Sequence, residues 1–210
     1  MKKFTCPSCG APVECRSAVS ISMVCPYCQS LLLRQDLGLE YAGEKALLIE
    51  DQSPYQVGTE GSIGKIRFTL LGRLRFQWEQ GFWDEWFAWS DDGQTCWFAD
   101  AQGFLSFYVE VKTARGPEFQ PEKWKAGDSI KIDGKTWGVK DIKIVNLQSA
   151  MGEIPLVAKQ NRKSLSIDLT GQGDECATVE KGPEGYRVYL GRMYDFNDFK
   201  FSRLREVDGW

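Results

Sequence analysis

Residues 65–78 read Lys65-Ile66-Arg67-Phe68-Thr69-Leu70-Leu71-Gly72-Arg73-Leu74-Arg75-Phe76-Gln77-Trp78. Every even position except Gly72 is a large apolar residue, and nearly every odd position is polar. Because side chains alternate between the two faces of a strand, this period of two predicts strands with one face in the core. Gly72 stands where a β-bulge or a close backbone approach would bend the strands. The basic residues at positions 65, 67, 73 and 75 are expected on the solvent face.

Further strand signals follow at short intervals up to residue 112. The aromatic run at 82–89 leads into the hairpin turn Asp91-Asp92-Gly93, and Gln102-Gly103 marks the next turn. About five strands within sixty residues leave no room for crossover helices, so antiparallel pairing is predicted.

A second, fainter copy of this pattern follows. The stretch at 58–65 is similar to that at 127–135, and Asp92-Gly93-Gln94-Thr95-Cys96 is similar to Gln172-Gly173-Asp174-Glu175-Cys176. The offsets, 127 − 58 = 69 and 176 − 96 = 80, place about eleven extra residues in the second copy. An internal duplication is therefore expected, with Cys96 and Cys176 as equivalent core thiols.

A metal signal lies at the N-terminus. Two Cys-x-x-Cys pairs, Cys6-Pro7-Ser8-Cys9 and Cys25-Pro26-Tyr27-Cys28, have fifteen residues between them. This spacing is typical of a zinc ribbon, in which two tight turns direct four sulfurs at one ion. Gly10 permits the positive φ that such a turn often needs, and Gln29 holds the same place in the second pair. Four thiolates leave no open position, so one structural Zn²⁺ is expected. Cys15, within the same ribbon, is either a swapped ligand or a free thiol, and a free thiol is expected because Cys6 and Cys9 already form a suitable pair.

The fold class predicted is mainly β. It consists of a four-cysteine zinc ribbon at 1–34, a connector at 35–56, and two tandem small antiparallel β modules, barrel or sandwich-like, at 57–120 and 121–210. Within the connector, the alternation around Leu39 and Tyr41 suggests a short strand that closes the ribbon or docks on the next domain.

The composition excludes several classes of function. The 210 residues include no histidine, so no His-based triad, His-ligated catalytic metal or imidazole base can be built. The formal net charge of −3 argues against a nonspecific nucleic-acid binder. The first residues lack the apolar segment of a secretory signal, and no apolar run is long enough to cross a membrane. A cytoplasmic location without membrane insertion is expected, where seven cysteines serve as ligands or buried thiols.

The aromatic run is the candidate contact surface. Alternation puts Trp83 and Glu85 on one face of the strand and Asp84 and Trp86 on the other, so both faces carry large rings. One face would pack in the core, and the other would either pack under a neighbouring module or bind a partner or ligand. The residues proposed for such a surface are Trp83, Glu85, Trp86, Arg73 and Arg75. Asp84 and Glu85 point to opposite faces, which is poor geometry for a paired-carboxylate hydrolase.

Several of these motifs together resemble a known family. The motifs are Val57-Gly58-Thr59-Glu60-Gly61, Leu71-Gly72-Arg73-Leu74-Arg75, Trp83-Asp84-Glu85-Trp86 and Asp91-Asp92-Gly93. The sequence from Val57 to Leu204 is similar to the bacterial, β-rich family of domains of unknown function numbered 4178, whose members often carry an N-terminal zinc ribbon. The resemblance implies no established activity. It implies that the chain is an accessory protein. Members of the family resemble accessory proteins encoded beside polyamine aminopropyltransferase homologues and beside membrane-stress or small membrane proteins.

Two functions from different classes follow. The first is a noncatalytic adaptor whose zinc ribbon binds a protein partner, linked through the resemblance to polyamine metabolism or membrane stress. The second is a module that recognises a polyamine, a glycan or single-stranded nucleic acid through Trp83, Trp86 and nearby carboxylates, because acidic groups beside aromatic rings attract polycations. An enzyme is not expected.

Overall fold

The computed structural model describes residues 2–35, 38–46, 53–101, 103–112 and 119–207. These residues form antiparallel strands joined by short turns, as the sequence predicts, together with two 3₁₀ turns, η1 (Pro121–Lys123) and η2 (Phe196–Asp198). No helix in these ranges has the length and apolar character needed to cross a membrane.

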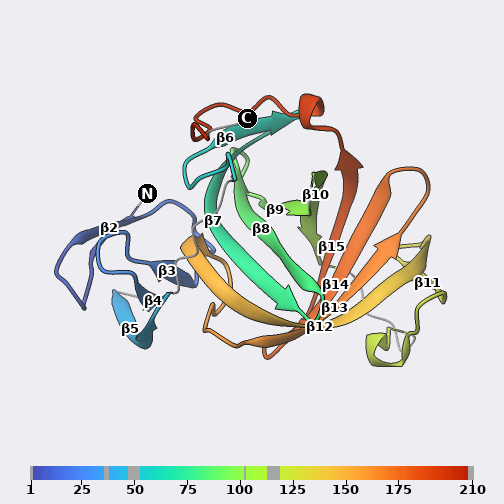
Figure 1. Ribbon diagram of the computed structural model, residues 1–210, viewed down its shortest axis with the longest axis horizontal. Coiled ribbons are helices and arrows are strands. Elements are labelled where there is room, and N and C mark those ends of the chain that lie inside the picture. The colour runs from blue at the N-terminus through green and yellow to red at the C-terminus, as the bar shows by residue number, and fades with distance from the viewer. Residues whose placement is uncertain (1, 36–37, 47–52, 102, 113–118, 208–210) are drawn as a thin grey trace.

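Eight strands close into a barrel (Figure 1). The first four are β7 (Ile66–Trp78), β8 (Gly81–Ser90), β9 (Thr95–Ala101) and β10 (Phe104–Val111). The other four are β12 (Lys135–Ile154), β13 (Lys163–Thr170), β14 (Glu175–Gly182) and β15 (Gly185–Tyr194). Their order around the barrel is β7-β8-β9-β10-β15-β14-β13-β12, and β12 pairs back onto β7 through Asn146–Gln77 to Gly152–Gly72. Strands β7 to β10 form one four-stranded meander, the first half of the barrel, and strands β12 to β15 form another, the second half.

The two expected β modules are therefore the two halves of a single closed sheet. β10 pairs with β15 and β12 with β7, so the boundary expected near residue 120 separates halves that share backbone hydrogen bonds. A four-stranded meander by itself would leave two unpaired edges, and closure removes them.

The halves also share an element order. A short strand leads each meander, β6 (Glu60–Ile63) before β7 and β11 (Ser129–Ile132) before β12, each forming a hairpin. The two turn segments that resemble each other lie between β8 and β9 and between β13 and β14. Cys96 lies opposite Ala88 on the outer face, whereas Cys176 lies opposite Thr170 on the inner face. Both thiols are buried, as expected of core thiols, but they do not occupy matching positions. A shift of one residue makes Ala177 the counterpart of Cys96.

Gly72 has both properties expected from its place in the strand. The register of β7 with β8 shifts between Leu70 and Gly72, which is a bulge. A Cβ atom at Gly72 would lie 2.0 Å from the carbonyl oxygen of Glu153. The strand bends here, and β12 passes so close that a side chain would not fit.

Both faces of the barrel wall are apolar. Leu74, Phe76, Phe87, Trp97 and Leu147 pack in the interior. Phe68, Leu70, Trp86 and Phe98 on the outer face are covered by Tyr55 and by Phe199 near the C-terminus. Val139, Leu169 and Val179 on the outer face of the second half are covered by β11 and the segment around Trp124. Because these segments cover the outer face, large apolar residues occur at both the inward-facing and the outward-facing positions of the strands.

The N-terminal module lies against one side of the barrel (Figure 1). It contains β1 (Lys2–Thr5), β2 (Pro12–Cys15), β3 (Ser22–Val24), β4 (Ser30–Arg34) and β5 (Leu39–Lys45). β5 falls within the expected connector and pairs with β4, so it closes the module, which is one of the two roles predicted for it. β3 pairs with the end of β12 through Met23–Glu153 and Ser22–Ile154, which joins the module to the barrel sheet.

Candidate functional site

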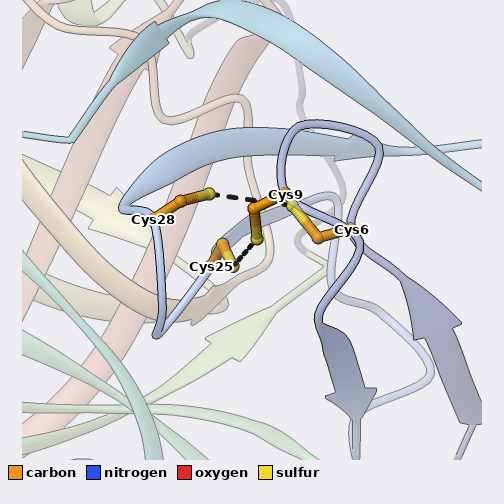
Figure 2. Close-up of side chains that lie close together, drawn as sticks. All are labelled: Cys6, Cys9, Cys25 and Cys28. Atoms are coloured by element: carbon orange, nitrogen blue, oxygen red, sulfur yellow. Dashed lines mark hydrogen bonds between the residues drawn. The ribbon is translucent and has the colours of Figure 1, made fainter.

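The four cysteines predicted as ligands gather at one point (Figure 2). Cys6 follows β1, and Cys25 follows β3, so each Cys-x-x-Cys pair occupies the turn of a hairpin. All four Sγ atoms lie within 4.8 Å of one another. The Sγ atoms of Cys6 and Cys28 are 3.8 Å apart, and those of Cys9 and Cys25 are also 3.8 Å apart.

The two turns have the same backbone pattern. The amide of Gly10 donates to the carbonyl of Cys6 at 2.9 Å, and the amide of Gln29 donates to the carbonyl of Cys25 at 2.9 Å. Gly10 and Gln29 both have positive φ, 77° and 62°. Positive φ was expected at this position of the turn, and both residues adopt it. Gln29 does so at some conformational cost, because its Cβ atom disfavours positive φ, whereas Gly10 has no Cβ atom.

The cluster could bind a metal ion. A tetrahedral ion with bonds of about 2.3 Å to sulfur has sulfur atoms about 3.8 Å apart along each edge. The two 3.8 Å separations match this edge, and the remaining pairs lie within 4.8 Å. Cys6 and Cys25 are buried and Cys9 is exposed, so the cluster lies at the surface of the module.

Cys15 lies apart from this cluster. Its Sγ donates to the carbonyl of Ser17 at 3.2 Å and lies 3.5 Å from Oε2 of Glu153, a barrel residue. Burial, followed by the negative charge of Glu153, raises the pKa of Cys15. A thiol with a raised pKa is a poor ligand and a poor nucleophile, which agrees with the expected free thiol.

The five residues proposed as one contact surface are distributed over both faces of the barrel wall. Trp83 and Glu85 are on the interior face of β8, where Trp83 Nε1 donates to Glu85 Oε1 at 2.8 Å. Trp86 is 1% exposed on the outer face. The alternation of faces is thus confirmed, but these residues do not form one exposed surface, because covering segments bury the outer face.

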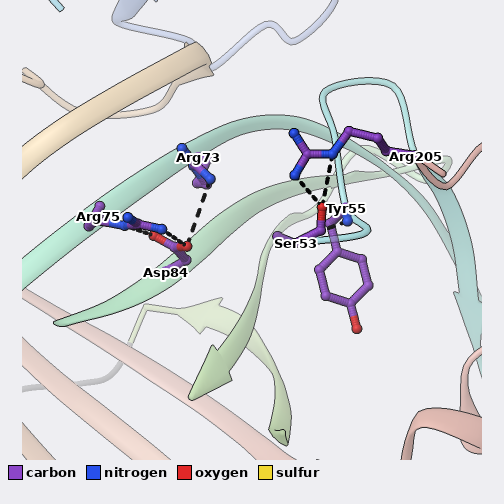
Figure 3. A network of polar contacts seen from close by, with 6 residues as sticks. All are labelled: Ser53, Tyr55, Arg73, Arg75, Asp84 and Arg205. Carbon is purple, nitrogen blue, oxygen red and sulfur yellow. Dashed lines mark hydrogen bonds and ion pairs between the residues drawn. The ribbon is translucent and has the colours of Figure 1, made fainter. Parts of the chain in front are cut away.

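Arg73 and Arg75 are not on the solvent face, in contrast to the expectation. Their exposures are 3% and 4%. Arg75 forms a two-pronged pair with Asp84, from Nε to Oδ1 at 2.7 Å and from Nη2 to Oδ2 at 2.6 Å (Figure 3). Nη1 of Arg73 lies 3.8 Å from the same carboxylate. The reason is cross-strand pairing with Asp84 together with ring contacts, since Arg73 lies over Trp86 and Arg75 over Phe82. This cluster therefore links β7 to β8.

A second polar group, which was not predicted from the sequence, lies inside the barrel. A cavity of about 20 Å³ is lined by Glu85, Trp97, Ala99, Tyr108, Thr178, Glu180 and Tyr189. Burial, and next the charge of Glu180, raises the pKa of Glu85 to about 8. Burial raises the pKa of Glu180 to about 7. Thr178 and Glu180 alternate with Ala177 and Val179 along β14, and this pattern was the available signal. A polar face of an antiparallel strand normally meets solvent, and only barrel closure turns it inward.

The chain matches the model of a known protein family. The family model described as "Domain of unknown function (DUF4178)" matches residues 56–195. This range includes all eight strands of the barrel but not the segment around Phe199 that covers part of its outer face. No curated protein matches the chain. No solved structure matches it either.

Proposed function

We propose that this chain, which belongs to the DUF4178 family of domains of unknown function, is a noncatalytic adaptor that holds a protein partner through a zinc-bound N-terminal ribbon. The observation that carries the proposal is the four-cysteine cluster, whose sulfur separations suit a tetrahedral ion. Cys6, Cys9, Cys25 and Cys28 would hold the metal. Zinc is favoured because four thiolates in a tetrahedron are a preferred structural zinc site.

A metal held by four protein thiolates has no position for water or substrate. Its contribution is to stability, since a module of this size buries too little apolar surface to fold alone. The metal would fix the backbone of both turns, and with it the side chains that the turns present. This is why a binding function is favoured over a catalytic one.

Tyr27 is the side chain best placed to meet a partner. It lies between Cys25 and Cys28 in the second turn, and 66% of its surface is exposed. Tyrosine is enriched at protein interfaces because its ring is apolar and its hydroxyl is polar. A rigid turn that presents an exposed tyrosine suits docking to another protein.

The chain itself offers a matched control for the test. Phe104, at the start of β10 on the barrel, is 67% exposed, nearly the same as Tyr27. Tagged full-length protein, Tyr27→Ala and Phe104→Ala would be used to capture partners from the native host, with quantitative mass spectrometry of the captured proteins. The proposal predicts a stoichiometric partner that Tyr27→Ala and Cys25→Ser lose and Phe104→Ala retains.

The adaptor proposal would be overturned by two results. One is a wild-type protein that captures no stoichiometric partner. The other is a partner that Phe104→Ala loses and Tyr27→Ala keeps, because the contact would then be on the barrel.

A ligand-binding barrel is the second candidate function. It is favoured by the interior cavity, where two carboxylates meet the rings of Trp97, Tyr108 and Tyr189. Among the ligands considered from sequence, a polyamine fits this chemistry better than single-stranded nucleic acid, whose phosphates the carboxylates would repel. A glycan would use the same rings, but it would leave the carboxylate charges without a counterion.

The remaining expectations belong to the same proposal. The shared element order of the two halves supports an internal duplication that produced the barrel. We place the protein in the bacterial cytoplasm, where thiolate ligands stay reduced, and link it to polyamine metabolism or membrane stress through the family resemblance alone.

A further inference from the structure

The segment that follows the barrel lies in a groove that the barrel itself forms. We propose that this groove, beside β6, is a docking site for an extended peptide of another protein with two aromatic residues two positions apart. Residues 199–205, here called the strap, occupy the groove in cis. The groove is on the barrel, so the inference goes beyond the adaptor function and is independent of the metal cluster.

The strap adds a strand to the outer edge of β6. β6 is the last strand in the order of the sheet, so β7 uses only one of its edges. Along the other edge, Lys200 exchanges two backbone hydrogen bonds with Ser62, at 3.0 and 3.2 Å, and Ser202 exchanges two with Glu60, at 2.9 and 3.1 Å. Figure 1 shows the strap, in red, running beside β6. An extended peptide of any sequence can form such main-chain bonds.

Two rings give the contact its specificity. Phe199 and Phe201 are two positions apart, so in an extended segment they point to the same side. Their ring centroids lie 5.3 and 5.5 Å from that of Phe98 on the outer face of the barrel. Lys200 and Ser202, which alternate with them, are exposed. Peptide-binding grooves use the same division, in which the main chain supplies affinity and alternate side chains supply specificity.

The groove belongs to the family domain, whereas the strap does not. Phe68, Phe98 and Phe107 contact the ring of Phe199, and all three lie within the matched range 56–195. The strap lies outside that range. The domain by itself therefore presents an aromatic surface beside an unpaired strand edge, which is the usual form of a site for strand addition.

The strap can leave the groove while the barrel stays folded. Besides the bonds to β6, it is held by a bond from Gln56 to the carbonyl of Arg203 and by one from the amide of Arg205 to the carbonyl of Pro54. The eight barrel strands pair with one another and not with the strap. A segment with so few bonds opens at a lower free energy than the whole fold.

An incoming peptide must compete with the strap. A segment tethered by a short linker, here residues 195–198, has an effective concentration of about millimolar. The intact chain should therefore bind a peptide weakly, and weakening of the strap should strengthen the binding by the factor by which the groove becomes free.

The probe is a fluorescein-labelled peptide of residues 196–207, titrated by fluorescence anisotropy into full-length, metal-containing protein. The full-length variant Phe199→Ser, Phe201→Ser, here called the strap-released variant, keeps the groove and loses both competing rings. It should bind the probe at least tenfold more tightly than wild type does. The probe carrying the same two substitutions should bind at least tenfold more weakly than the unmodified probe.

A second variant weakens the strap without removing its rings. Ser202→Pro deletes the N–H that Ser202 donates to Glu60, and the side chain of Ser202 is exposed. This variant should bind the probe at least threefold more tightly than wild type. Thermal melts confirm that each variant is folded, so at least one variant tests the competition if the loss of both rings unfolds the chain.

Proline substitutions locate the groove on β6. In the strap-released variant, Ser62→Pro removes the N–H that donates to Lys200, so binding of the probe should fall at least tenfold. Lys131→Pro is the matched control, because Lys131 pairs with Thr136 at the same place in the hairpin of β11 and β12 as Ser62 does with Arg67 in that of β6 and β7. It should bind the probe as the strap-released variant does.

A random-peptide display selection against the strap-released variant identifies the pattern of the partner. We expect enrichment of aromatic residues two positions apart. The inference is overturned by a selection without this pattern, by no binding of the probe to the folded variants, or by equal binding after Ser62→Pro. A wild-type dimer that the strap-released variant converts to a monomer, measured by light scattering, would also overturn it, because the occupant would be a second copy of this chain.

The probe titration uses purified protein and does not involve Tyr27. If it fails while partner capture through Tyr27 succeeds, the groove inference fails and the adaptor proposal stands. If the probe binds while no partner depends on Tyr27, the groove inference stands and the adaptor proposal fails.

Discussion

Glu153 Oε2 accepts a hydrogen bond from Ser20 Oγ at 2.8 Å, across 133 positions of sequence. The same carboxylate accepts from the amide of Arg16 at 2.8 Å and from the amide of Ser17 at 3.0 Å. Glu153 is 6% exposed and lies near the end of β12, the strand that also pairs with β3. One buried carboxylate therefore fastens the N-terminal module to the barrel, and several N–H and O–H donors stabilise its charge.

Glu153→Gln should loosen this attachment. The amide keeps the size of the side chain but turns one acceptor into a donor, which faces the N–H groups of Arg16 and Ser17. We expect a loss of about 1–3 kcal/mol in the free energy of unfolding. Urea denaturation measures it, and hydrogen exchange should rise at residues 16–20 before the barrel opens.

The matched control for this variant is Glu14→Gln, an exposed residue of the same module. It should change stability by less than about 0.5 kcal/mol, because exposed ion pairs contribute little. Equal effects of the two substitutions would show that Glu153 does not fasten the module.

Gly72→Ala should be destabilising because β12 passes directly over this position. The added methyl would lie 2.0 Å from the carbonyl oxygen of Glu153, so the backbone must move. A cost of about 1–3 kcal/mol is expected from overpacking. Gly81→Ala is the control on the neighbouring strand, where the nearest atom would be 3.6 Å away. If thermal melts gave the two variants the same stability, the close approach would be wrong.

The pair of Arg75 and Asp84 should be strongly coupled. Their side chains are 5% and 12% exposed, so removal of Asp84 takes two short, charged hydrogen bonds from a buried guanidinium. Asp84→Ala should cost about 3–5 kcal/mol, whereas the double variant Arg75→Met, Asp84→Leu should recover much of it. A double-mutant cycle by denaturant unfolding measures the coupling. Additive effects would contradict the paired geometry.

Glu85 and Glu180 should make the barrel less stable as the pH rises. Their folded pKa values, about 8 and about 7, lie above the ordinary value of 4.5. Between the ordinary pKa and the raised folded-state pKa, the folded state binds more protons than the unfolded state. The free energy of unfolding therefore falls as the pH rises through this range. The double variant Glu85→Gln, Glu180→Gln should therefore lose less stability than wild type between about pH 5 and pH 9. Thermal melts across this range test it, and parallel curves would refute it.

Local patterns in the sequence accounted for the strands and the cysteine cluster. The alternation at 65–78 and the short turns are properties of neighbouring residues, and two Cys-x-x-Cys pairs need only two turns to meet. The bend at Gly72 followed from the same kind of local reasoning.

Barrel closure could not be predicted in this way. The pairing of β12 with β7 joins residues that lie 69 (146 − 77) to 80 (152 − 72) positions apart, and no local pattern encodes it. Without it, the polar positions of β14 were assigned to solvent, so Glu180 went unnoticed. Arg75 was expected in solvent for a different reason, because no local pattern shows that Asp84 and the ring of Phe82 cover it on the outer face. Glu153 was missed for a similar reason, since its donors lie in another module.

The proposed function depends above all on four cysteines that hold one metal ion. Native mass spectrometry of full-length protein, purified without chelator and under reducing conditions, tests this directly. We predict the mass of the chain plus one zinc ion, with Cys6→Ser and Cys25→Ser each losing the ion and Cys15→Ser keeping it. Metal-free wild-type protein whose four thiols all react at once with an alkylating reagent in the folded state would contradict the claim.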